Sequence, residues 1–342
     1  MTDLVGAVLT RPSIDAGQAA GVLERTWGIR GELSPLPSER DRNFAVRVAG
    51  EDRFVLKVSN RAEDPAFLEL QHAALAILAG AGVPCQQAVR SIAGDAIVAW
   101  SPTALDAPLL VRVLTWLPGR PLSAVSPASR SSALLEDLGA TMGRTARALM
   151  GFDHPAAHRD FQWEASRALD VIAAHTGAVV DAARADLLAR WQVRLARLAA
   201  ALPALRHGVI HNDANDNNVL VADDGGSISG LLDLGDAVYS IVANELAVAA
   251  AYAALDAPEP LAVIAAVRRG FEREVPLTDE EAVVVLDLVA LRLCTSVALS
   301  AHQSRLAPDD PYLTISERPA WELLAALESA GAGATTTTAA GR

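Results

Sequence analysis

The stretch "VIHNDANDNNVLV", Val209 to Val221, places seven small polar or titratable side chains between two apolar, β-branched ends. The chain of 342 residues has only seven asparagines, and four of them lie in this stretch. A short apolar segment, 208–210, leads into His211-x-Asp213, and Asn218 follows five residues after the aspartate. Asparagine and aspartate also form ordinary turns, so the loop needs a second element before it indicates a site.

The residues after this loop supply that second element. The segment "VLVADDGGSISGLLDLGD" predicts a strand, a Gly-Gly turn and a second strand that ends at Asp233, with Asp236 three residues further on. A hairpin of this kind would bring Asp213, Asn218 and Asp233 together. Two oxygen-donating side chains beside a third carboxylate suit Mg²⁺, which usually also takes phosphate oxygens from a nucleotide. The remaining Asp213 carboxylate could then accept a proton from a hydroxyl nucleophile.

The positive charges are distributed unevenly. Of the 29 Lys plus Arg residues, Lys57 is the only lysine, which suggests a position that needs a compact ammonium; chance is the alternative. Lys57 lies near the end of a predicted hairpin formed by Phe44–Val48 and Phe54–Val58. The helix that follows begins at Asp64-Pro65 and carries Glu69 on a face of small residues. That carboxylate could meet a cation on the sheet, or it could simply be solvated.

The rest of the chain divides into a β-rich part and a helical part. Extended runs near Leu33–Leu36, Ala96–Trp100 and Leu109–Trp116 precede the break "LPGRP" at 117–121. Helical spacing then predicts helices near 127–149, 163–175, 180–202, 244–255, 260–272, 279–303 and 318–329. We therefore expect an α+β fold with a β-rich lobe at 1–116, a mainly helical lobe at 117–330 and a low-complexity, disordered tail at 331–342.

Composition restricts the classes of partner. The net charge of −12 argues against nucleic acid and against an anionic membrane surface. No apolar run approaches the ~20 residues of a membrane span, and the N-terminus shows no signal-peptide pattern. The two cysteines, Cys85 and Cys294, lie far apart in the sequence, which argues against a disulfide framework and fits a reducing cytoplasm.

With these motifs the sequence resembles the aminoglycoside phosphotransferase and choline kinase superfamily, over nearly the whole chain up to about residue 329. The segments "SERDRNF", "FVLKVS", "HNDANDNNVLV" and "LLDLGDAVYS" resemble its hydroxylysine kinase branch, which includes kinases fused to a pyridoxal-phosphate aminotransferase-like domain. The resemblance implies a protein-kinase-like bilobal fold with a nucleotide-binding N-lobe. Two features depart from the pattern: "PSERDRNF" contains no glycine, and Asn212 stands where many relatives have glycine.

The resemblance also implies roles at the catalytic loop. Asp213 would be the catalytic base that orients the acceptor hydroxyl, and Asn218 and Asp233 would bind Mg²⁺. His211 would order the loop and take no part in the chemistry. The phosphoryl donor would be ATP or GTP.

Nucleotide contacts in the N-lobe are implied in the same way. Lys57 would contact the α- and β-phosphates and would be fixed by an ion pair with Glu69, with Glu63 as the alternative partner. The other implied contacts are Ser38, in the loop 38–43 over the phosphates, and Thr115 and Leu117, in the hinge 114–117 that meets the adenine.

The expected activity is transfer of the γ-phosphoryl group to the hydroxyl of a small amino alcohol, either hydroxylysine-like or ethanolamine-like. An ammonium near the reacting hydroxyl would need carboxylate or aromatic partners, because its burial is otherwise costly. The candidate acceptor residues are Trp163, Asp236, Glu245 and Arg292, although Glu245 could simply charge the start of a helix. Two alternatives remain open, an aminoglycoside-type antibiotic kinase and a nucleotide-binding pseudokinase, and the protein could be a monomer or a homodimer.

Overall fold

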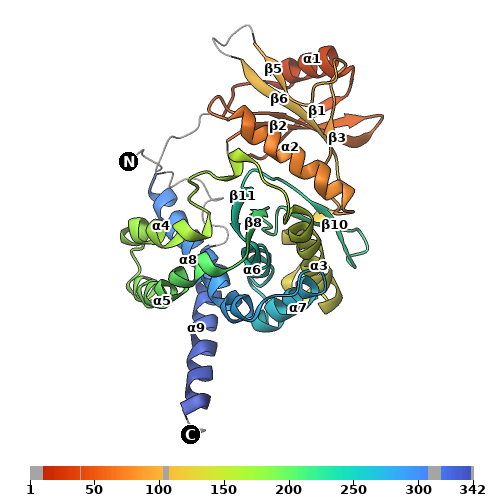
Figure 1. The fold of residues 1–342 in the computed structure, drawn as a ribbon. Coiled ribbons are helices and arrows are strands. Elements are labelled where there is room, and N and C mark those ends of the chain that lie inside the picture. Colours follow the sequence, from red (N-terminus) through yellow and green to blue (C-terminus); the bar gives the residue numbers. More distant parts are fainter. Residues whose placement is uncertain (1–10, 39, 103–107, 307–316, 340–342) are drawn as a thin grey trace. The chain divides into compact units, whose positions relative to one another are not determined.

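The computed structural model describes residues 11–38, 40–102, 108–306 and 317–339 (Figure 1). The chain forms two compact units, which we describe separately. Unit 1 comprises Met1–Pro118 and Ser229–Leu231, and unit 2 comprises Gly119–Ile228 and Leu232–Arg342. The expected α+β class is confirmed, because an N-terminal antiparallel sheet precedes a mainly helical part.

Unit 1 contains a six-stranded antiparallel sheet. Its strands run in the order β1 (Glu32–Leu36), β2 (Arg42–Val48), β3 (Glu51–Val58), β6 (Leu109–Thr115) and β4 (Ala88–Val89), and β5 (Val98–Trp100) also pairs with β6. The turn between β2 and β3 is Ala49-Gly50, and both residues have positive φ, at 53° and 89°. Two left-handed residues suit a two-residue hairpin turn. The predicted hairpin is therefore present, with Lys57 near the end of its second strand.

Helix α1 (Ala16–Trp27) was not expected from the sequence. Asp15 caps it reciprocally with Gln18, and Gly28 ends it in a left-handed conformation with φ of 68°. Its buried side chains join those of the sheet in one apolar core, which includes Val22, Leu23, Trp27, Phe44, Leu56, Val111 and Val113. Helix α2 (Pro65–Gly80) begins as predicted, with Asp64 accepting a hydrogen bond from the Ala66 N–H and Pro65 in the first turn.

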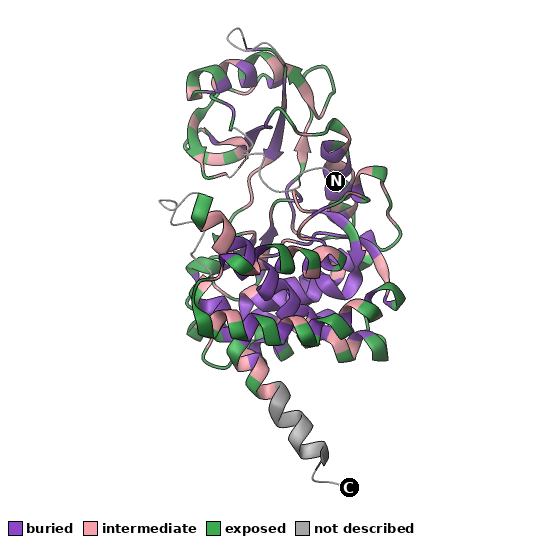
Figure 2. Ribbon diagram, turned by 90° about the vertical axis from the view of Figure 1, so that its left-hand side faces the viewer, coloured by how far each residue is buried: buried purple, intermediate pink, exposed green. Residues whose placement is uncertain are grey.

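Unit 2 is built mainly from helices. They are α3 (Ser132–Leu149), α4 (Ala168–His175), α5 (Ala182–Ala201), α6 (Val242–Ala253), α7 (Pro260–Glu272), α8 (Asp279–Leu306) and α9 (Glu317–Ala339). Figure 2 shows buried residues concentrated in the helices of this unit. Helix α9 reaches Ala339, and residues 340–342 lie outside the described part of the chain. The disordered tail expected from residue 331 stays a prediction.

Helix α8 meets the length and apolarity of a membrane span, although the sequence led us to expect no such run. Its most apolar window is 67% buried inside the structure, where α8 packs against α4, α6 and α9. Burial of this kind is typical of the core helix of a globular unit. Within the described residues, α8 is the only helix that passes this test.

Glycines allow α3 and α7 to pack closely. A Cβ atom on Gly139 would lie 1.9 Å from the Val267 carbonyl oxygen, and one on Gly270 would lie 1.9 Å from the Glu136 carbonyl oxygen. Neither position can hold a larger residue unless the backbones move apart. The two helices form part of the support beneath α6, which both of them contact.

Short strands carry the polar loop of unit 2. Strand β8 (His207–Ile210) pairs antiparallel with β11 (Val238–Ile241), with Ile210 opposite Val238. Strand β9 (Val219–Val221) pairs with β7 (Arg120–Pro121). The predicted Gly-Gly turn closes through a hydrogen bond from the Ala222 N–H to the Ser227 carbonyl, 2.9 Å. Strand β10 (Ile228–Leu231) follows the turn and returns the chain to the loop.

Candidate active site

Two sets of backbone contacts bring the ends of the polar loop together. The pairing of β8 with β11 places His211 beside the segment that precedes Val238. The Leu232 N–H donates to the Asn218 carbonyl, 2.8 Å. The chain therefore returns to Asn218 one residue before Asp233, as the predicted hairpin requires.

His211 orders the loop. Its side chain is fully buried, Nε2 donates to the Leu232 carbonyl at 2.8 Å, and Nδ1 accepts from the Asp213 N–H at 3.2 Å. Burial lowers the pKa of His211 to about 4, so the imidazole is neutral. A neutral ring with both nitrogens bonded to backbone has a structural role, as expected.

Glu245 fixes the same loop from α6. Its two carboxylate oxygens accept from the backbone N–H groups of His211 and Asn212, at 3.1 Å and 3.0 Å. Burial raises the pKa of Glu245 to about 7, while the two N–H donors act in the opposite direction. Both oxygens are engaged and the side chain is buried, so Glu245 supports the loop from behind. The expected contact of Glu245 with the acceptor stays a prediction.

The backbone conformation at Asn212 accounts for asparagine at a position where many relatives have glycine. Its φ is 65°, in the left-handed region that glycine adopts freely and asparagine tolerates best among other residues. Its amide nitrogen donates to the Trp163 carbonyl at 3.3 Å, and its amide oxygen accepts from Asn244 at 3.1 Å. Asparagine thus satisfies the same backbone geometry and adds two side-chain hydrogen bonds.

Asp213 is surrounded by hydrogen-bond donors. One carboxylate oxygen accepts from Asn215 Nδ2 at 3.0 Å and from Arg292 Nη2 at 3.1 Å. The other accepts from Asn218 Nδ2 at 2.7 Å and from Asn215 at 3.1 Å. About 20% of the Asp213 side chain remains exposed. The role of Asn215 was not predicted, although its place in the polar cluster was a signal for it.

The electrostatics of Asp213 reflect a concentration of negative charge. The pKa of Asp213 is raised to about 8, first by burial and then by the charges of Asp236 and Asp233. Arg292 and the hydrogen bond from Asn215 oppose this rise. A cation bound nearby would relieve the repulsion among the three carboxylates.

The donor set fits a hard divalent cation. Asn218 and Asp233 are adjacent through the Leu232–Asn218 backbone bond, and Asp233 is exposed to solvent. In the described residues no group of three His, Cys, Asp or Glu forms a complete ligand set. One carboxylate and one amide oxygen are what Mg²⁺ uses where nucleotide phosphates and water complete its shell.

Arg292 and Trp163, both predicted, lie together at Asp213. The Arg292 guanidinium is centred 4.2 Å from the Trp163 ring and 5.6 Å from the Tyr252 ring, and its side chain is 4% exposed. Asp236 belongs to the same cluster, because its charge acts on both Asp213 and Arg292. Tyr252, on α6, was missed, since nothing in its sequence context separates it from a packing residue.

In unit 1, Lys57 is buried and lies opposite Arg112 in the register of β3 and β6. Glu69 is exposed, and no ion pair joins it to Lys57 within the described residues. Helix α2 instead turns Gln71 toward the sheet, where Gln71 is buried and accepts from Arg112 Nη1 at 2.7 Å. Positions 69 and 71 face different sides of the helix, so the structure does not place Glu69 toward the sheet, and its ion pair with Lys57 stays a prediction. Glu63, the alternative, precedes α2 as expected.

The loop that begins at Ser38 closes on itself. Ser38 Oγ accepts from the Asp41 N–H at 3.2 Å, and the Asp41 carboxylate accepts from the backbone and side chain of Asn60. Glu39, within this loop, lies outside the described residues. These hydrogen bonds hold Ser38 and Asp41, which flank Glu39 in the glycine-free loop.

The hinge residues differ in what their backbones already bind. The Thr115 N–H donates to the Gln87 carbonyl and the Trp116 N–H to the Arg53 carbonyl, each at 2.9 Å. Both donors are thus used inside unit 1. Of the two predicted hinge residues, Leu117 is the better candidate for a backbone contact with adenine.

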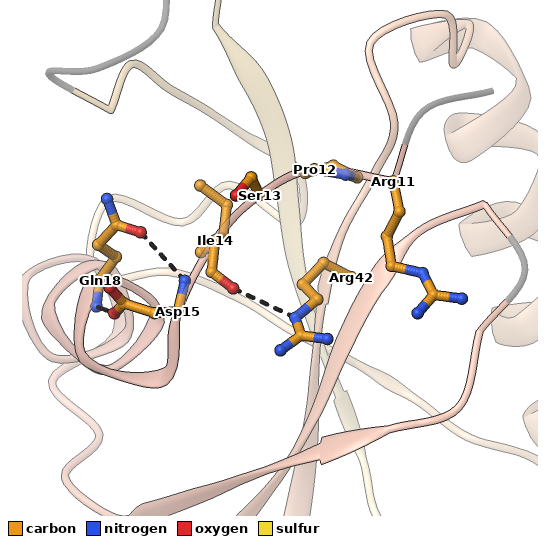
Figure 3. A pocket seen from close by; sticks show the side chains of 7 residues that line it. All are labelled: Arg11, Pro12, Ser13, Ile14, Asp15, Gln18 and Arg42. Atoms are coloured by element: carbon orange, nitrogen blue, oxygen red, sulfur yellow. Dashed lines mark hydrogen bonds between the residues drawn. The ribbon is translucent and has the colours of Figure 1, made fainter.

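A cavity of about 480 Å³ lies elsewhere in unit 1 (Figure 3). It is lined by Arg11, Pro12, Ser13, Ile14, Asp15, Gln18 and Arg42. Figure 3 shows Arg42 donating to the Ile14 carbonyl, at 3.2 Å, beside the reciprocal cap of α1. The cavity contains none of the predicted site residues.

Known proteins resemble this chain over nearly its whole length. It is 29% identical to a hydroxylysine kinase of Bos taurus over 342 residues, covering 92% of this chain and 90% of that protein. It is 30% identical to a hydroxylysine kinase of Danio rerio over 328 residues, covering 90% of each. Hydroxylysine kinases are thus relatives in sequence as well as in motif.

Solved structures show the same fold. An amicoumacin kinase, solved with AMP-PNP, Ca²⁺ and Ami, matches with a TM-score of 0.70 at 16% identity, covering 91% of this chain and 93% of that one. A microcompartment-associated aminopropanol kinase matches with a TM-score of 0.69 at 17% identity, covering 92% and 98%.

The sequence model of the phosphotransferase enzyme family matches residues 32–282, which include both the Lys57 strand and the Asp213 loop. The resemblance read from the motifs is confirmed, and so is the kinase-like fold. The chain therefore belongs to the phosphotransferase enzyme family and is a hydroxylysine kinase-like, ATP-dependent small-molecule phosphotransferase.

Proposed function

We propose that this enzyme transfers the γ-phosphoryl group of ATP or GTP to the hydroxyl of a small amino alcohol. The observation that carries the proposal is the Asp213 carboxylate, held by Asn215, Asn218 and Arg292 at the end of β8. The sequence relatives are hydroxylysine kinases, and one structural neighbour is an aminopropanol kinase. Both names describe acceptors that combine a hydroxyl with an amine.

Asp213 orients the acceptor hydroxyl and takes its proton as the oxygen attacks phosphorus. Its three neighbours fix the carboxylate before substrate arrives, so little reorganisation is needed in the transition state. Bound Mg²⁺ would neutralise charge on the phosphoryl oxygens, and Asn218 and Asp233 would hold it. Lys57 would meet the nucleotide phosphates with a compact charge.

The acceptor amine would be recognised by charge and by an aromatic face. Asp236 is half-buried, and Trp163 presents a partly exposed ring near Asp213. A buried ammonium needs such partners to offset the loss of its hydration. A charge-assisted contact at Asp236 would also align the hydroxyl with Asp213.

The test compares acceptors that differ only in the amine. kcat/KM is measured for amino alcohols and for matched alcohols that lack the amine, with ATP and then GTP as donor. We expect the amino alcohols to be phosphorylated far better. Equal values for both members of each pair would reject the amine site and leave phosphoryl transfer standing.

A further inference from the structure

We propose that Arg159 is a positioning residue that holds the segment 233–237, which carries Asp233 and Asp236, against the catalytic loop. The inference rests on the proposed function, because it concerns the segment whose carboxylates would meet the metal and the acceptor amine. It starts from a turn that has few hydrogen bonds of its own and from the side chain that bridges this turn.

The segment 233–237 is a tight polar turn. Asp233 has a φ of 56°, in the left-handed region that costs free energy for residues other than glycine. The hydrogen bonds within the turn are local. The Gly235 N–H donates to Asp233 Oδ1 at 3.0 Å. The Ala237 N–H donates to the Leu234 carbonyl at 3.2 Å, and pairing with β8 begins only after the turn, in β11. Contacts from outside the turn are therefore needed to fix where its carboxylates lie.

Arg159 supplies such a contact. Its Nη2 donates to the carbonyl oxygens of Gly235 and Ala237, at 3.0 Å and 3.3 Å. These two carbonyls lie on either side of Asp236 in the sequence, so one guanidinium nitrogen bridges the turn at the residue that carries the carboxylate. A hydrogen bond from a charged donor is stronger than one between neutral groups. Arg159 thus fixes the backbone on both sides of Asp236.

The Arg159 side chain is itself anchored. Its guanidinium carbon lies 4.0 Å from the centre of the Phe161 ring, a distance typical of a cation–π contact. The Phe161 ring is buried and packs in an apolar cluster with Ile210 and Val238, which face each other in the pairing of β8 with β11. The cation therefore acts from a rigid base, the strand pair that adjoins both the turn and the catalytic loop.

The stretch 159–163 also contacts the catalytic loop. The Trp163 carbonyl accepts from the side-chain amide of Asn212 at 3.3 Å, one residue before Asp213. This stretch thus binds the turn at one end and the catalytic loop at the other. Repulsion between Asp213 and the two carboxylates of the turn favours separation of the loop and the turn, and the stretch 159–163 opposes that separation.

The experiment compares the wild-type enzyme with Arg159→Gln and Arg159→Met, which remove the charge, and with Arg159→Lys, which keeps it. Arg194→Gln is the matched control, because Arg194 also lies over an aromatic ring, Trp191 at 4.9 Å, and donates to Asp287 at 2.8 Å, on a helix that carries no residue of the proposed site. Two quantities are measured. One is hydrogen–deuterium exchange of the backbone amides in the ligand-free proteins. The other is the Mg²⁺ concentration that gives half-maximal transfer from ATP to hydroxylysine and to aminopropanol.

In Arg159→Gln we expect the amides of Gly235 and Ala237 to exchange on the order of tenfold to a hundredfold faster, the scale of losing a hydrogen bond from a charged donor. The amides of β8 and β11 should exchange as in the wild type. The Mg²⁺ requirement should rise on the order of tenfold, while kcat at saturating Mg²⁺ changes little, because a bound cation itself draws the carboxylates together. Arg159→Lys should recover part of both effects, and Arg194→Gln should show neither.

Unchanged exchange in the turn of Arg159→Gln would overturn the inference, as would an unchanged Mg²⁺ requirement. Exchange that rises equally in β8 and β11 would also overturn it, since Arg159 would then support the unit as a whole. If Arg159→Gln does not fold, Arg159→Met, which keeps the packing over Phe161, decides by the same criteria; failure of both to fold would again mean general support. Absence of transfer to either acceptor by the wild-type enzyme would reject the proposed function for these amino alcohols, whereas exchange in the turn would still decide the positioning role.

Discussion

At the scale of single residues, Asp213 is the side chain on which the proposed chemistry depends. Asp213→Asn keeps the size of the side chain and removes the carboxylate that accepts the proton. We expect kcat to fall by a factor on the order of 10² or more, the usual scale of general base catalysis. Nucleotide affinity, measured by calorimetry, should change little. Transfer at nearly the wild-type rate would contradict the assignment.

Lys57 offers a second test, because it is the only lysine in the chain. Lys57→Arg preserves the charge but replaces a compact ammonium with a broader planar group in a buried position. We predict a large loss of kcat/KM for the nucleotide with the fold intact by circular dichroism. The matched control is Arg53→Lys, an exposed position on the same strand. Full activity in Lys57→Arg would mean that the single lysine is there by chance.

Glu245 predicts a pH dependence. Its pKa in the folded protein is about 7, raised by burial from 4.5, so between these values the folded state binds more protons than the unfolded state. The free energy of unfolding therefore falls as pH rises through this window, by roughly 3 kcal/mol from this group. Glu245→Gln cannot titrate, so wild type should lose stability relative to the variant between pH 5 and pH 7.5 in urea unfolding. If the free energy of unfolding varied with pH in the same way for both proteins, the raised pKa of Glu245 would be refuted.

Individual residues also show where sequence reasoning succeeds. The sequence was enough to predict that Asp213, Asn218 and Asp233 lie close together in space. A short hairpin between Asn218 and Asp233 returns the chain to the loop that carries Asp213. Glu245 and Tyr252 could not be assigned, since their roles depend on how α6 packs behind the loop. Local sequence spacing is enough to place the loop residues, whereas the roles of the α6 residues depend on tertiary packing.

At the scale of elements, the close approach of α3 and α7 makes a stability prediction. Gly270→Ala would push a methyl group to within 1.9 Å of the Glu136 carbonyl, so the helices must separate. We expect a loss of at least about 3 kcal/mol, at the upper end for overpacking. Gly80→Ala, in the last turn of α2, is the control, because a Cβ there meets nothing within 4 Å and alanine favours the helix. Thermal unfolding of both variants provides the measurement; equal melting temperatures would refute the tight contact.

The helices also show the limits of periodicity. The start of α2 was predicted from Asp64 and Pro65, since a cap acts locally. The sequence did not show which of its polar side chains faces the sheet, where Gln71 and not Glu69 lies on the buried side. Helix α1 was missed altogether, although Asp15 and Gln18 supply a capping box that could have revealed it.

At the scale of the whole molecule, burial predicts the reactivity of the two cysteines. Both thiols are free and buried. Burial raises the pKa of Cys85 to about 11 and raises that of Cys294 as well, so neither forms thiolate near neutral pH. Iodoacetamide at pH 8 should leave both unmodified in the native protein and label both in denaturant, as mass spectrometry would show. Rapid native labelling of either cysteine would contradict its burial.

The fold class followed from the sequence because a β-rich segment and a helical segment differ in period over many residues. The long apolar helix α8 was harder to interpret, since length and composition alone do not separate a core helix from a membrane span. Its burial among α4, α6 and α9 supplies the missing information.

The left-handed backbone at Asn212 has a consequence for how the sequence varies among related chains. Glycine at this position would keep the backbone conformation but would lose both side-chain hydrogen bonds, one of which pairs with the buried amide of Asn244. A family member with glycine at 212 would leave that amide without its partner, so selection for asparagine at 244 would weaken. The two positions, 32 residues apart, should therefore covary among related chains. Chains with asparagine at 212 should also have asparagine at 244, and chains with glycine at 212 should more often have another residue at 244.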